Sequence, residues 1–416
     1  MSVEFYPEVK KTTMDYIVKG IRYVCENFKN RSPGSVTERE TQEYFAKELA
    51  KWSDDVKTEE FELHPTSFMG FMPIAGLLVI VSIGLFVLNK YIPSVFFSVL
   101  SPALTLISVL MFLSQFLFYR KYFDFLFPKA VSKNVYAVRK PAGEVKRRII
   151  FGGHADASWE WTYSIHGQMA ALAPIICGSI GGMFFKFIAD IIYLLAGSPP
   201  IEGGWNIVMV CQIALLPFCV AIMFFINWRV VVDGANDNLS ACYAAMAILK
   251  EMAEEGFRFE NTEVGCLITG AEEAGLRGAK HFAKRHAKEL LKVETVIVPF
   301  ETLREIEQLA VYNRDETGMV HNDERVVELL IEAGKAAGIK LSRAPVYPGS
   351  TDAAAFTQAG LPSAGLGGVN HNPQKYYHTR YDTWDNIGED CIEKSIEIGM
   401  RAAILYDKSG LGSKTK

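Results

Sequence analysis

The sequence predicts an α/β domain of three layers, helix–sheet–helix, with a mostly parallel central sheet that two transmembrane helical hairpins interrupt. Short apolar runs alternate with amphipathic helical runs, and this alternation is typical of a parallel sheet covered by helices. Four long apolar segments in two pairs break the alternation, and each is close to the roughly 20 residues that cross a bilayer. The 416 residues therefore predict one large domain or two domains, with four membrane spans.

The four apolar segments carry no charged residue within their bounds. The third segment continues past Lys186 and Asp190 into a further apolar run, and the fourth has tryptophan at both ends, as residues at membrane interfaces often do. We weigh two buried core hairpins of a soluble protein as the alternative and favour membrane spans. The segments are 68–88, 95–118, 167–185 and 205–228.

Two hairpins return the chain to the side of the membrane that it left, so the hydrophilic sequence lies on one side. The opposite loops carry Lys90, with Lys186 as a further candidate. The positive-inside rule then predicts an integral, multi-pass membrane protein whose α/β domain lies in the cytoplasm. The basic residues that flank the spans on the domain side are Arg120, Lys121, Lys129 and Arg229.

Composition excludes some functions. The formal net charge is −4, and no basic stripe with interleaved aromatic residues occurs, so nucleic acid is not an expected partner. Three of the seven cysteines lie inside apolar segments and no paired framework is evident, which fits a reducing compartment. The amino terminus has no apolar signal region, so we expect no cleaved signal peptide.

The expected order of segments follows from these boundaries. Residues 1–67 begin the α/β domain, 68–118 form the first hairpin, and 119–166 continue the domain. Residues 167–228 form the second hairpin, 229–407 complete the domain, and 408–416 form a polar, glycine-rich, flexible tail.

The elements of the domain can be placed in chain order. Ser35–Glu38 is a capping box that opens a helix through Trp52, and Lys57–Leu63 alternates as a half-buried strand that leads into the first hairpin. Two neighbouring strands joined by a turn at Pro141–Gly143 come next. The remaining predicted elements are strands at 134–138, 148–151, 263–269 and 295–300, and helices at 239–255, 325–338 and 389–406.

Ligand-type side chains gather at the ends of the predicted strands. Ligands of parallel sheets bind outside the carboxyl ends of the strands, so these side chains are expected to meet. Two imidazoles with several carboxylates make a zinc-type set of donors. The residues are His154, Asp156, Asp237, Glu272, Glu273, Glu301 and His378.

Five short motifs in this order resemble those of the di-zinc aminopeptidases and glutamate carboxypeptidases, metallopeptidase family twenty-eight. The opening Arg31–Glu38 is also similar to that family's, and the resemblance covers nearly everything outside the hairpins. It implies a zinc-exopeptidase-like fold. The motifs are His154-Ala-Asp156, Gly234-Ala-Asn-Asp-Asn238, Glu272-Glu-Ala-Gly275, Glu301 and Tyr377-His-Thr-Arg-Tyr-Asp-Thr383.

The resemblance also implies a role for each residue. Asp237 bridges two Zn²⁺ ions, His154 and Glu301 complete one site, and Glu273 and His378 complete the other. Glu272 is the general base, and Asp156 is the partner of His154 in the second shell. Two such metals lower the pKa of a water molecule and polarise a carbonyl oxygen. Tyr377 either helps to stabilise the oxyanion or only packs beside His378.

Two departures from the family pattern bear on function. The second hairpin separates Asp237 from His154, where the family has a short loop, so the membrane is expected beside the site. Ala353 stands where a histidine is common, which leaves specificity open. Asp352 either shapes the substrate pocket or caps its turn. The remaining histidines match no ligand position and are expected on the surface or in the core: His64, His166, His281, His286, His321 and His371.

The predicted function is a membrane-anchored zinc metallopeptidase, an aminopeptidase acting on short peptides. Hairpins beside the site suggest substrates that are apolar or arrive from the bilayer. One alternative is a glutaminyl-peptide cyclase with a single zinc, and another is a non-catalytic membrane receptor or scaffold on a peptidase fold. The expected partners are a peptide substrate and the lipid bilayer, and the sequence leaves the oligomeric state open.

Overall fold

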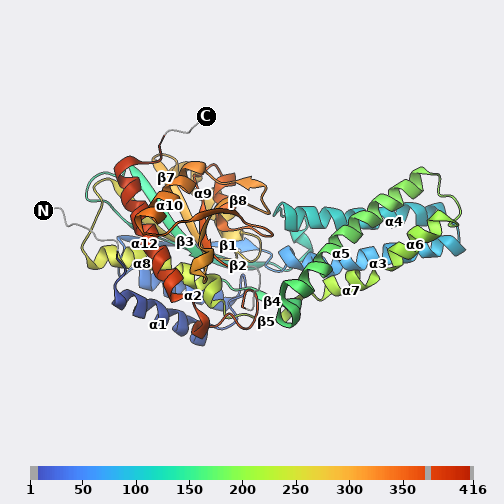
Figure 1. The fold of residues 1–416 in the computed structure, drawn as a ribbon, viewed down its shortest axis with the longest axis horizontal. Coiled ribbons are helices and arrows are strands. Elements are labelled where there is room, and N and C mark those ends of the chain that lie inside the picture. Colours follow the sequence, from blue (N-terminus) through green and yellow to red (C-terminus); the bar gives the residue numbers. More distant parts are fainter. Residues whose placement is uncertain (1–7, 371–375, 413–416) are drawn as a thin grey trace.

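The computed structural model describes residues 8–370 and 376–412, which form an α/β body and an elongated arm of helices that projects from it (Figure 1). The predicted flexible tail is shorter than expected, because the last helix, α12 (Glu389–Ser409), continues to Ser409. Residues 413–416 of that tail lie outside the described residues.

The body is built on a mixed sheet whose central strands are parallel. The order across the sheet is β1-β2-β6-β3-β7-β11-β8-β10, with β9 beside β8. Strands β6, β3, β7 and β11 run parallel, whereas the pairs β1–β2, β2–β6 and β8–β11 are antiparallel. The strands are β1 (Asp55–Leu63), β2 (Ala130–Arg139), β3 (Arg147–His154), β6 (Thr262–Thr269), β7 (Glu294–Leu303), β8 (Ala310–Asp315), β9 (Val320–His321), β10 (Ser342–Pro345) and β11 (Gly365–Gly368).

Helices cover both faces of the sheet, so the three layers predicted from sequence are confirmed. Alternate residues of the central strands enter different hydrophobic clusters, as Ile149 and Ile150 of β3 do. One cluster packs under α1 (Lys11–Asn27), α2 (Val36–Leu49), α8 (Ala241–Glu254), α10 (Glu324–Ala336) and α12. The other packs under α9 (Arg277–Leu290), α11 (Asp352–Gln358) and the root of the arm, which contributes Phe68 and Tyr119.

The prediction that the strands at 134–138 and 148–151 are neighbours is wrong. Strand β6 lies between them, antiparallel to β2 and parallel to β3. The link between β2 and β3 forms no tight turn, because its N–H groups bond to the segment that leads into β6: Ala142 donates to Phe259 O at 2.8 Å and Gly143 donates to Glu260 O at 2.9 Å.

Half of the predicted capping box at α2 is confirmed. The Ser35 hydroxyl accepts the Glu38 N–H at 3.0 Å. The Glu38 carboxylate does not return to the Ser35 N–H, as a capping box requires, because it accepts three other hydrogen bonds deeper in the body. Its donors are the Gly34 N–H, the Ser132 hydroxyl and the Ala271 N–H.

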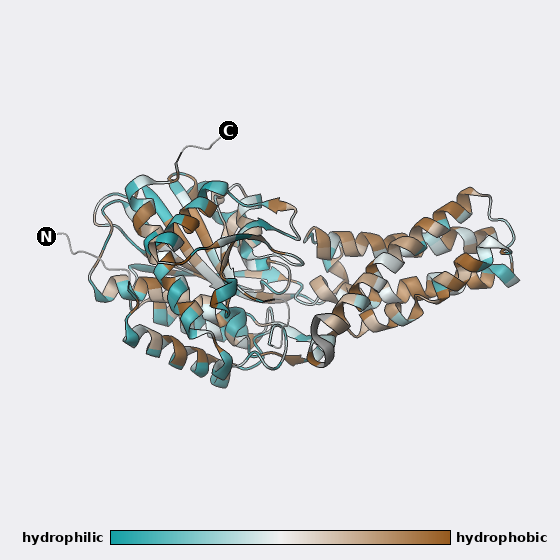
Figure 2. Cartoon of the chain, in the orientation of Figure 1, coloured by the Kyte–Doolittle hydropathy of each residue, from teal (hydrophilic) through white to brown (hydrophobic). Residues whose placement is uncertain are grey.

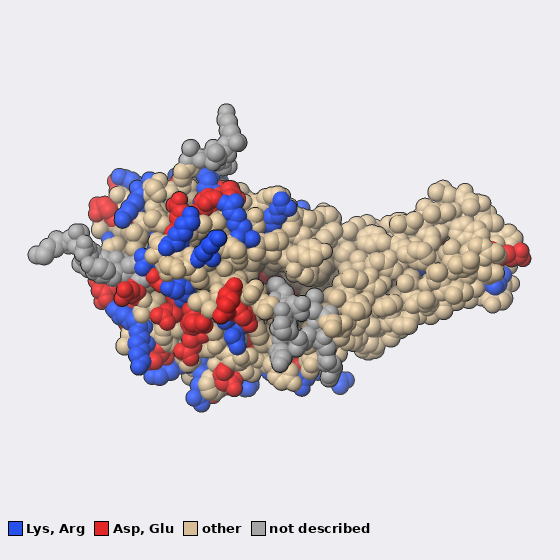
Figure 3. Space-filling view, in the orientation of Figure 1, with Lys and Arg blue, Asp and Glu red and all other residues tan. Residues whose placement is uncertain are grey.

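Four helical stretches of the arm are long and apolar enough to cross a membrane, by length and composition, and the fourth of them, Gly204–Met223, combines two consecutive helices. The arm is hydrophobic along most of its length (Figure 2), and the face in Figure 3 shows almost no charged side chains between the body and the far tip. The arm consists of α3 (Ser67–Tyr91), α4 (Val95–Met111), the π-helical turn η1 (Phe112–Leu117), α5 (Thr162–Leu195), α6 (Gly204–Ile213) and α7 (Leu216–Met223).

Each hairpin of the arm is inserted between two paired strands. The first leaves the end of β1 and returns at the start of β2, where Leu63 pairs with Ala130. The second leaves β4 (Trp159–Trp161) and returns at β5 (Ile226–Val231), where Trp161 pairs with Ile226. The predicted fourth segment therefore extends too far, since Trp228 belongs to β5.

Lys186 lies inside the arm and is not a loop residue, contrary to one of the options in the sequence analysis. Its ammonium group pairs with Asp190 one turn further along α5, and both side chains are buried. The Ser101 hydroxyl of α4 donates to Asp190 Oδ2 at 2.6 Å, and the Gln212 amide of α6 donates to Asp190 Oδ1 at 3.0 Å. This polar cluster joins three helices of the arm.

We expect Asp190→Ala to destabilise the arm by about 3–5 kcal/mol, because it leaves the buried Lys186 charge without a partner. The apolar triple variant Lys186→Met/Asp190→Leu/Gln212→Leu should retain most of the parent stability, since it removes both charges and the Gln212 donor together, and the Ser101 hydroxyl keeps Ser82 O as an acceptor. Denaturation of the purified protein in detergent, followed by far-UV circular dichroism, measures both. If Asp190→Ala were as stable as the parent protein, the Lys186–Asp190 pair would not stabilise the arm.

Candidate metal centre

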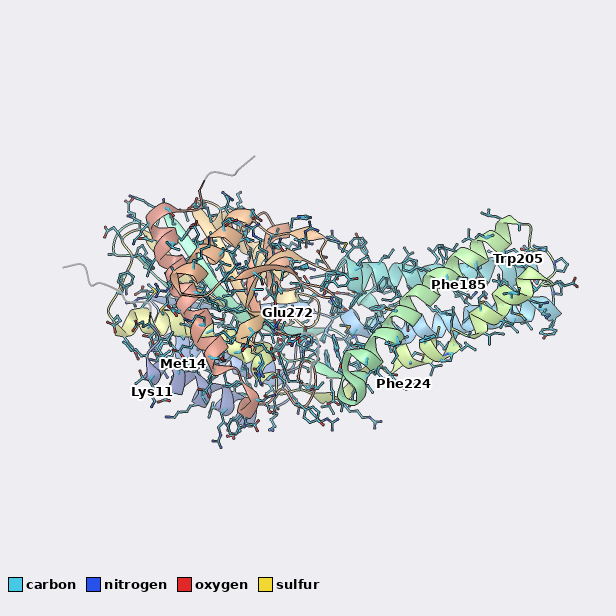
Figure 4. The ribbon with its side chains drawn as sticks, viewed as in Figure 1. Lys11, Met14, Phe185, Trp205, Phe224 and Glu272 are labelled. Carbon is cyan, nitrogen blue, oxygen red and sulfur yellow. The ribbon has the colours of Figure 1, made fainter. Side chains whose placement is uncertain are left out.

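The ligand-type side chains meet at the carboxyl ends of the central strands. His154 ends β3, Glu272 and Glu273 follow β6, and Glu301 lies near the end of β7. Asp237 comes from the turn η3 (Ala235–Ser240) before α8, and His378 from a loop before α12. The acidic side chains and His378 line a cavity to which the arm also contributes Phe68, Met69 and Phe116 (Figure 4 labels Glu272).

Five of these residues form two groups that share Asp237. In one group, His154 Nε2 lies 3.3 Å from Asp237 Oδ1 and 3.8 Å from Glu301 Oε1. In the other, His378 Nε2 lies 3.0 Å from Asp237 Oδ2 and 3.1 Å from Glu273 Oε1. The candidate ligand atoms within each group all lie within 4.8 Å of one another. Asp237 thus offers one oxygen to each group.

These spacings fit metal ions. Ligand atoms about 2.0–2.2 Å from a tetrahedral zinc ion lie about 3.3–3.6 Å from each other, close to the separations observed. Glu273 Oε1 is buried, and the donor 3.1 Å from it, His378 Nε2, is itself a candidate ligand, so a cation would satisfy both atoms. No lysine or arginine occurs among the described residues that line this cavity. The donor set therefore calls for cations that the side chains do not supply.

The protonation of His378 leads to the same conclusion. Burial lowers its pKa, but the Glu273 charge and hydrogen bonds to Asp237 and Glu273 raise the pKa to about 10. Burial and Asp237 raise the pKa of Glu301 to about 7, although His154 lowers it. The carboxylates thus hold a proton on His378 where a metal ion would take its place, since imidazole binds metal in the neutral form.

Glu272 lies beside the first group. Its Oε2 is 3.7 Å from His154 Nε2, and burial, followed by the charges of Glu301 and Glu273, raises its pKa well above the usual range. Geometry alone also allows Glu272 to join His154 and Glu273 as a ligand. Its role as a base therefore rests on the resemblance and remains a proposal.

Asp156 holds the turn that carries the two glutamates. Its Oδ1 accepts the Glu272 N–H and its Oδ2 accepts the Glu273 N–H, each at 3.0 Å. His154 Nδ1 lies 3.2 Å from the Asp156 backbone oxygen and 3.5 Å from Oδ1. The predicted contact with His154 is present, and the stronger contacts are with the glutamate turn.

Two buried residues of the amino-terminal motif support the site, a role that the sequence analysis did not assign. Glu38 Oε1 accepts the N–H of Ala271, which has a left-handed backbone (φ 52°) directly before Glu272. Arg31 donates to Ala155 O at 3.1 Å and to Asp233 O at 2.6 Å, and thereby ties the loop after His154 to the loop before Asp237. The similarity of Arg31–Glu38 to the opening segment of the family was the sequence signal that could have identified this role.

Asp382 positions the shared ligand, which the sequence analysis also missed. It accepts the Asp237 N–H at 3.0 Å, and its Oδ1 accepts both the backbone and side-chain N–H of Asn236 at 2.8 Å. Burial and the Asp237 charge raise the pKa of Asp382 to about 7, although hydrogen bonds to Asn236 and Asp237 lower it. Its place in the motif Tyr377–Thr383 was the available signal.

The base of the arm contacts the candidate ligand His378 directly. The backbone N–H of Trp161 donates to His378 O at 2.8 Å. The indole ring of Trp161 lies edge-on to the imidazole of His378, with ring centroids 4.4 Å apart. The preceding residue, Glu160, is buried and accepts hydrogen bonds from two guanidinium nitrogens of Arg380, Nε and Nη2, each at 2.7 Å. The Ser158 hydroxyl lies 3.1 Å from His378 Nδ1. None of these contacts was predicted.

Tyr377 packs beside His378, which is one of the two roles that the sequence analysis gave for it. Its ring stacks on the imidazole with centroids 4.0 Å apart and an interplanar angle of 15°. Tyr377 also lines the cavity that contains Glu272 and Glu301. A role in stabilising an oxyanion remains a proposal.

Asp352 is not the cap of its turn. Thr351 is the N-cap of α11, with its hydroxyl accepting the Ala353 N–H at 3.3 Å, while Asp352 accepts the Thr269 hydroxyl at 2.5 Å. The described histidines outside the metal groups bind elsewhere: His64 contacts Phe127 O, and His286 contacts Glu59. His371 and the side chain of His166 lie outside the described residues.

Comparisons with known proteins agree on the fold. The family model of peptidase family M28 matches residues 224–402, which contain four of the five residues in the two groups. No curated protein matches the sequence. At identities of 13–14%, the likeness to the solved structures below is one of fold.

Three solved structures illustrate this likeness. An aminopeptidase from Aneurinibacillus sp. strain AM-1 has a TM-score of 0.55 at 13% identity, covering 96% of this chain and 94% of that chain. BSAP, a zinc aminopeptidase from Bacillus subtilis, has a TM-score of 0.54 at 13% identity, with 97% and 96% covered. A glutaminyl cyclase from Fimbriiglobus ruber has a TM-score of 0.54 at 14% identity, with 96% and 97% covered.

We expect Asp156→Asn to weaken metal binding about 10–100-fold, because the amide turns an NH₂ group toward one of the two backbone N–H donors of the glutamate turn. Competition with a chelating dye measures the affinity. Asp54→Asn is the matched control. Asp54 binds Arg258, which precedes β6, and so lies at the amino ends of the central strands, away from the metal centre. Equal affinity in both variants would show that Asp156 does not position the ligands.

Proposed function

We propose that this chain is a metallopeptidase of peptidase family M28, and that it uses two zinc ions to remove amino-terminal residues from peptides. The observation that carries the proposal is the pair of donor groups that share Asp237, with the buried Glu272 beside them. Each group combines imidazole and carboxylate donors, which zinc favours. His154 and Glu301 complete one site, and Glu273 and His378 complete the other.

Two bound zinc ions supply a lowered water pKa and the polarisation of the scissile carbonyl. Glu272 accepts the proton of the attacking water on its carboxylate and transfers it to the leaving amine, so that the amine departs neutral. Burial raises its pKa, which makes the carboxylate a stronger proton acceptor than an exposed glutamate. The Tyr377 hydroxyl is the proposed donor to the oxyanion.

The lining of the cavity favours a free amino terminus over a peptide carboxylate. The cavity of about 80 Å³ is lined by four acidic side chains, and no lysine or arginine occurs among the described residues that line it. Once two zinc ions have balanced the four carboxylates, a peptide carboxylate would find no cationic side chain to bind it. This lining supports an aminopeptidase over a carboxypeptidase.

Two other functions fit the same fold. A glutaminyl-peptide cyclase needs a single zinc, and a solved structure of that name is among those similar to this chain. Five donors in two groups support hydrolysis with two metals instead. A non-catalytic receptor or scaffold is disfavoured, because decay of the site would remove donors that are present and well positioned.

We further propose that the arm crosses a membrane and that the body lies in the cytoplasm. The basic residues Arg120, Lys121 and Arg229 flank the arm at the body, whereas its far tip offers Lys90 and Glu202. Because Lys186 is buried inside the arm, it no longer counts toward the far side. The difference supports a cytoplasmic body.

We expect Glu272→Gln to lower peptide hydrolysis by about 10²–10⁴-fold and to keep its zinc, because the amide cannot take the proton. The purified protein in detergent, loaded with zinc, is incubated with a mixed peptide library and read by mass spectrometry, and zinc content is measured in parallel. Glu289→Gln, an exposed change on α9, is the matched control and should match the parent.

The products separate the candidate functions. Stepwise loss of amino-terminal residues, absent in Glu272→Gln, supports the aminopeptidase. Loss of ammonia from glutamine-headed peptides without shortening would assign the chain to the cyclases instead. Bound zinc with no change in any peptide would favour the scaffold.

Membrane sidedness is testable with single cysteines. Tyr91 at the tip is 71% exposed, and Lys51 on the body is also exposed. We expect a membrane-impermeant maleimide to label Tyr91→Cys on intact cells and Lys51→Cys only after lysis. The native cysteines are either buried or lie in the arm. The reverse labelling pattern would place the body outside the cytoplasm.

A further inference from the structure

The arm contains an apolar cavity of about 160 Å³. It lies between α3, η1, α5 and α7. Among the described residues that line it, none is charged, and the Ser179 hydroxyl is directed to Phe218 O at 3.0 Å. An apolar cavity of about 150 Å³ in another protein stays dry and binds a hydrocarbon, so an apolar occupant is expected here. The deeper wall includes Met72, Val79, Phe112, Ile176, Met183 and Ile222.

The cavity is long and narrow. On α3 it is lined from Met69 to Val79, and on α5 from Leu172 to Met183, and both helices run from the body toward the tip (Figure 1). Ten or eleven residues of α-helix at about 1.5 Å each correspond to a length of about 15 Å. A volume of about 160 Å³ spread over that length describes an elongated space, which suits a linear group better than a bulky one. No standard amino-acid side chain is long enough to extend about 15 Å from a scissile amide at the mouth of the cavity.

The mouth of the arm cavity adjoins the metal centre. The two cavities share Met69, Phe116, Trp161, Pro348 and Tyr377 in their walls. Both Trp161 and Tyr377 contact the imidazole of His378. A molecule with its scissile amide at the metal centre can therefore extend an apolar chain past these two rings into the arm.

We propose that the arm cavity binds one linear hydrocarbon chain of the substrate, carried by the amino-terminal residue of the peptide that is hydrolysed. This inference rests on the proposed function and names its substrate class. The amino-terminal residue lies at the metal centre, and the chain leaves its α-carbon toward Trp161 and Tyr377. The substrate is thus an amphiphile, which fits a site placed against four bilayer-length helices.

The test uses peptides X-Ala-Ala in which X is an unbranched 2-amino acid, from alanine to 2-aminohexadecanoic acid. We expect kcat/KM in nanodiscs to rise up to about fourfold for each methylene group added. The rise should end near twelve carbons, since bonds of about 1.5 Å advance an extended chain by about 1.25 Å per carbon. A maximum at the side-chain length of norleucine, followed by a fall, would overturn the proposal.

Variants of the cavity shift this limit in opposite directions. Val79→Phe, deep in the cavity, should end the rise at a shorter chain and leave alanine-headed peptides unchanged. Met183→Ala should move the limit to longer chains. Val81→Phe is the matched control, because Val81 lies on the same helix but is 44% exposed on the outside of the arm. An unchanged limit in both cavity variants would overturn the proposal.

A binding measurement separates this inference from the proposed function. The free amino acids 2-aminododecanoic acid and alanine are titrated calorimetrically into metal-free parent protein and Val79→Phe. Tighter binding of the long chain to the parent, lost in Val79→Phe, supports the cavity even if no peptide is cleaved. Hydrolysis of alanine-headed peptides with no dependence on chain length would keep the peptidase and reject the substrate class. That result would leave a structural lipid as the occupant.

Discussion

The concentration of carboxylates around Asp237 is the constraint on which the rest of the site depends. Four acidic side chains face one small cavity, and without cations they would repel one another or take up protons. The surrounding chain holds them in place with hydrogen bonds to the backbone: Asp156 binds the glutamate turn, and Asp382 binds the loop of Asp237. Rigid placement keeps the two donor groups apart and leaves Asp237 as their common member.

The insertion of the arm is compatible with this rigidity because each hairpin begins and ends on paired strands. The pairs β1–β2 and β4–β5 close the sites of insertion, so the sheet does not depend on what lies between them. The arm also completes the hydrophobic cover of the face that α9 and α11 leave open, through Phe68 and Tyr119. The arm is therefore part of the body's core at its root and a separate bundle beyond it.

Five strands, four helices of the body, the helices of the arm and the set of side chains at the strand ends could be predicted from the sequence, because periodicity and ordered motifs report them directly. The helices α1, α9 and α11 and the strands β4, β5 and β8–β11 were not predicted. The order of the strands was not predicted either, since β6 separates β2 from β3 although the chain passes from one to the other. Residues that act through hydrogen bonds were also missed: Glu38 resembled a capping residue, and Asp382 stood in a motif without a role. Lys186 was ambiguous because a charge in an apolar span is explained only by its partner, Asp190.

The direct link from β4 to α5 has a mechanical consequence. Strand β4 holds His378 through the Trp161 N–H and holds Arg380 through Glu160, and it continues without a break into the longest helix of the arm. A helix whose apolar length exceeds the thickness of its bilayer adjusts by tilting. In the membrane-crossing arm that we propose, such a tilt of α5 would act on the candidate ligand His378 and leave His154 and Glu301 in the central sheet undisturbed. The thickness of the bilayer would then set how well the two donor groups are aligned.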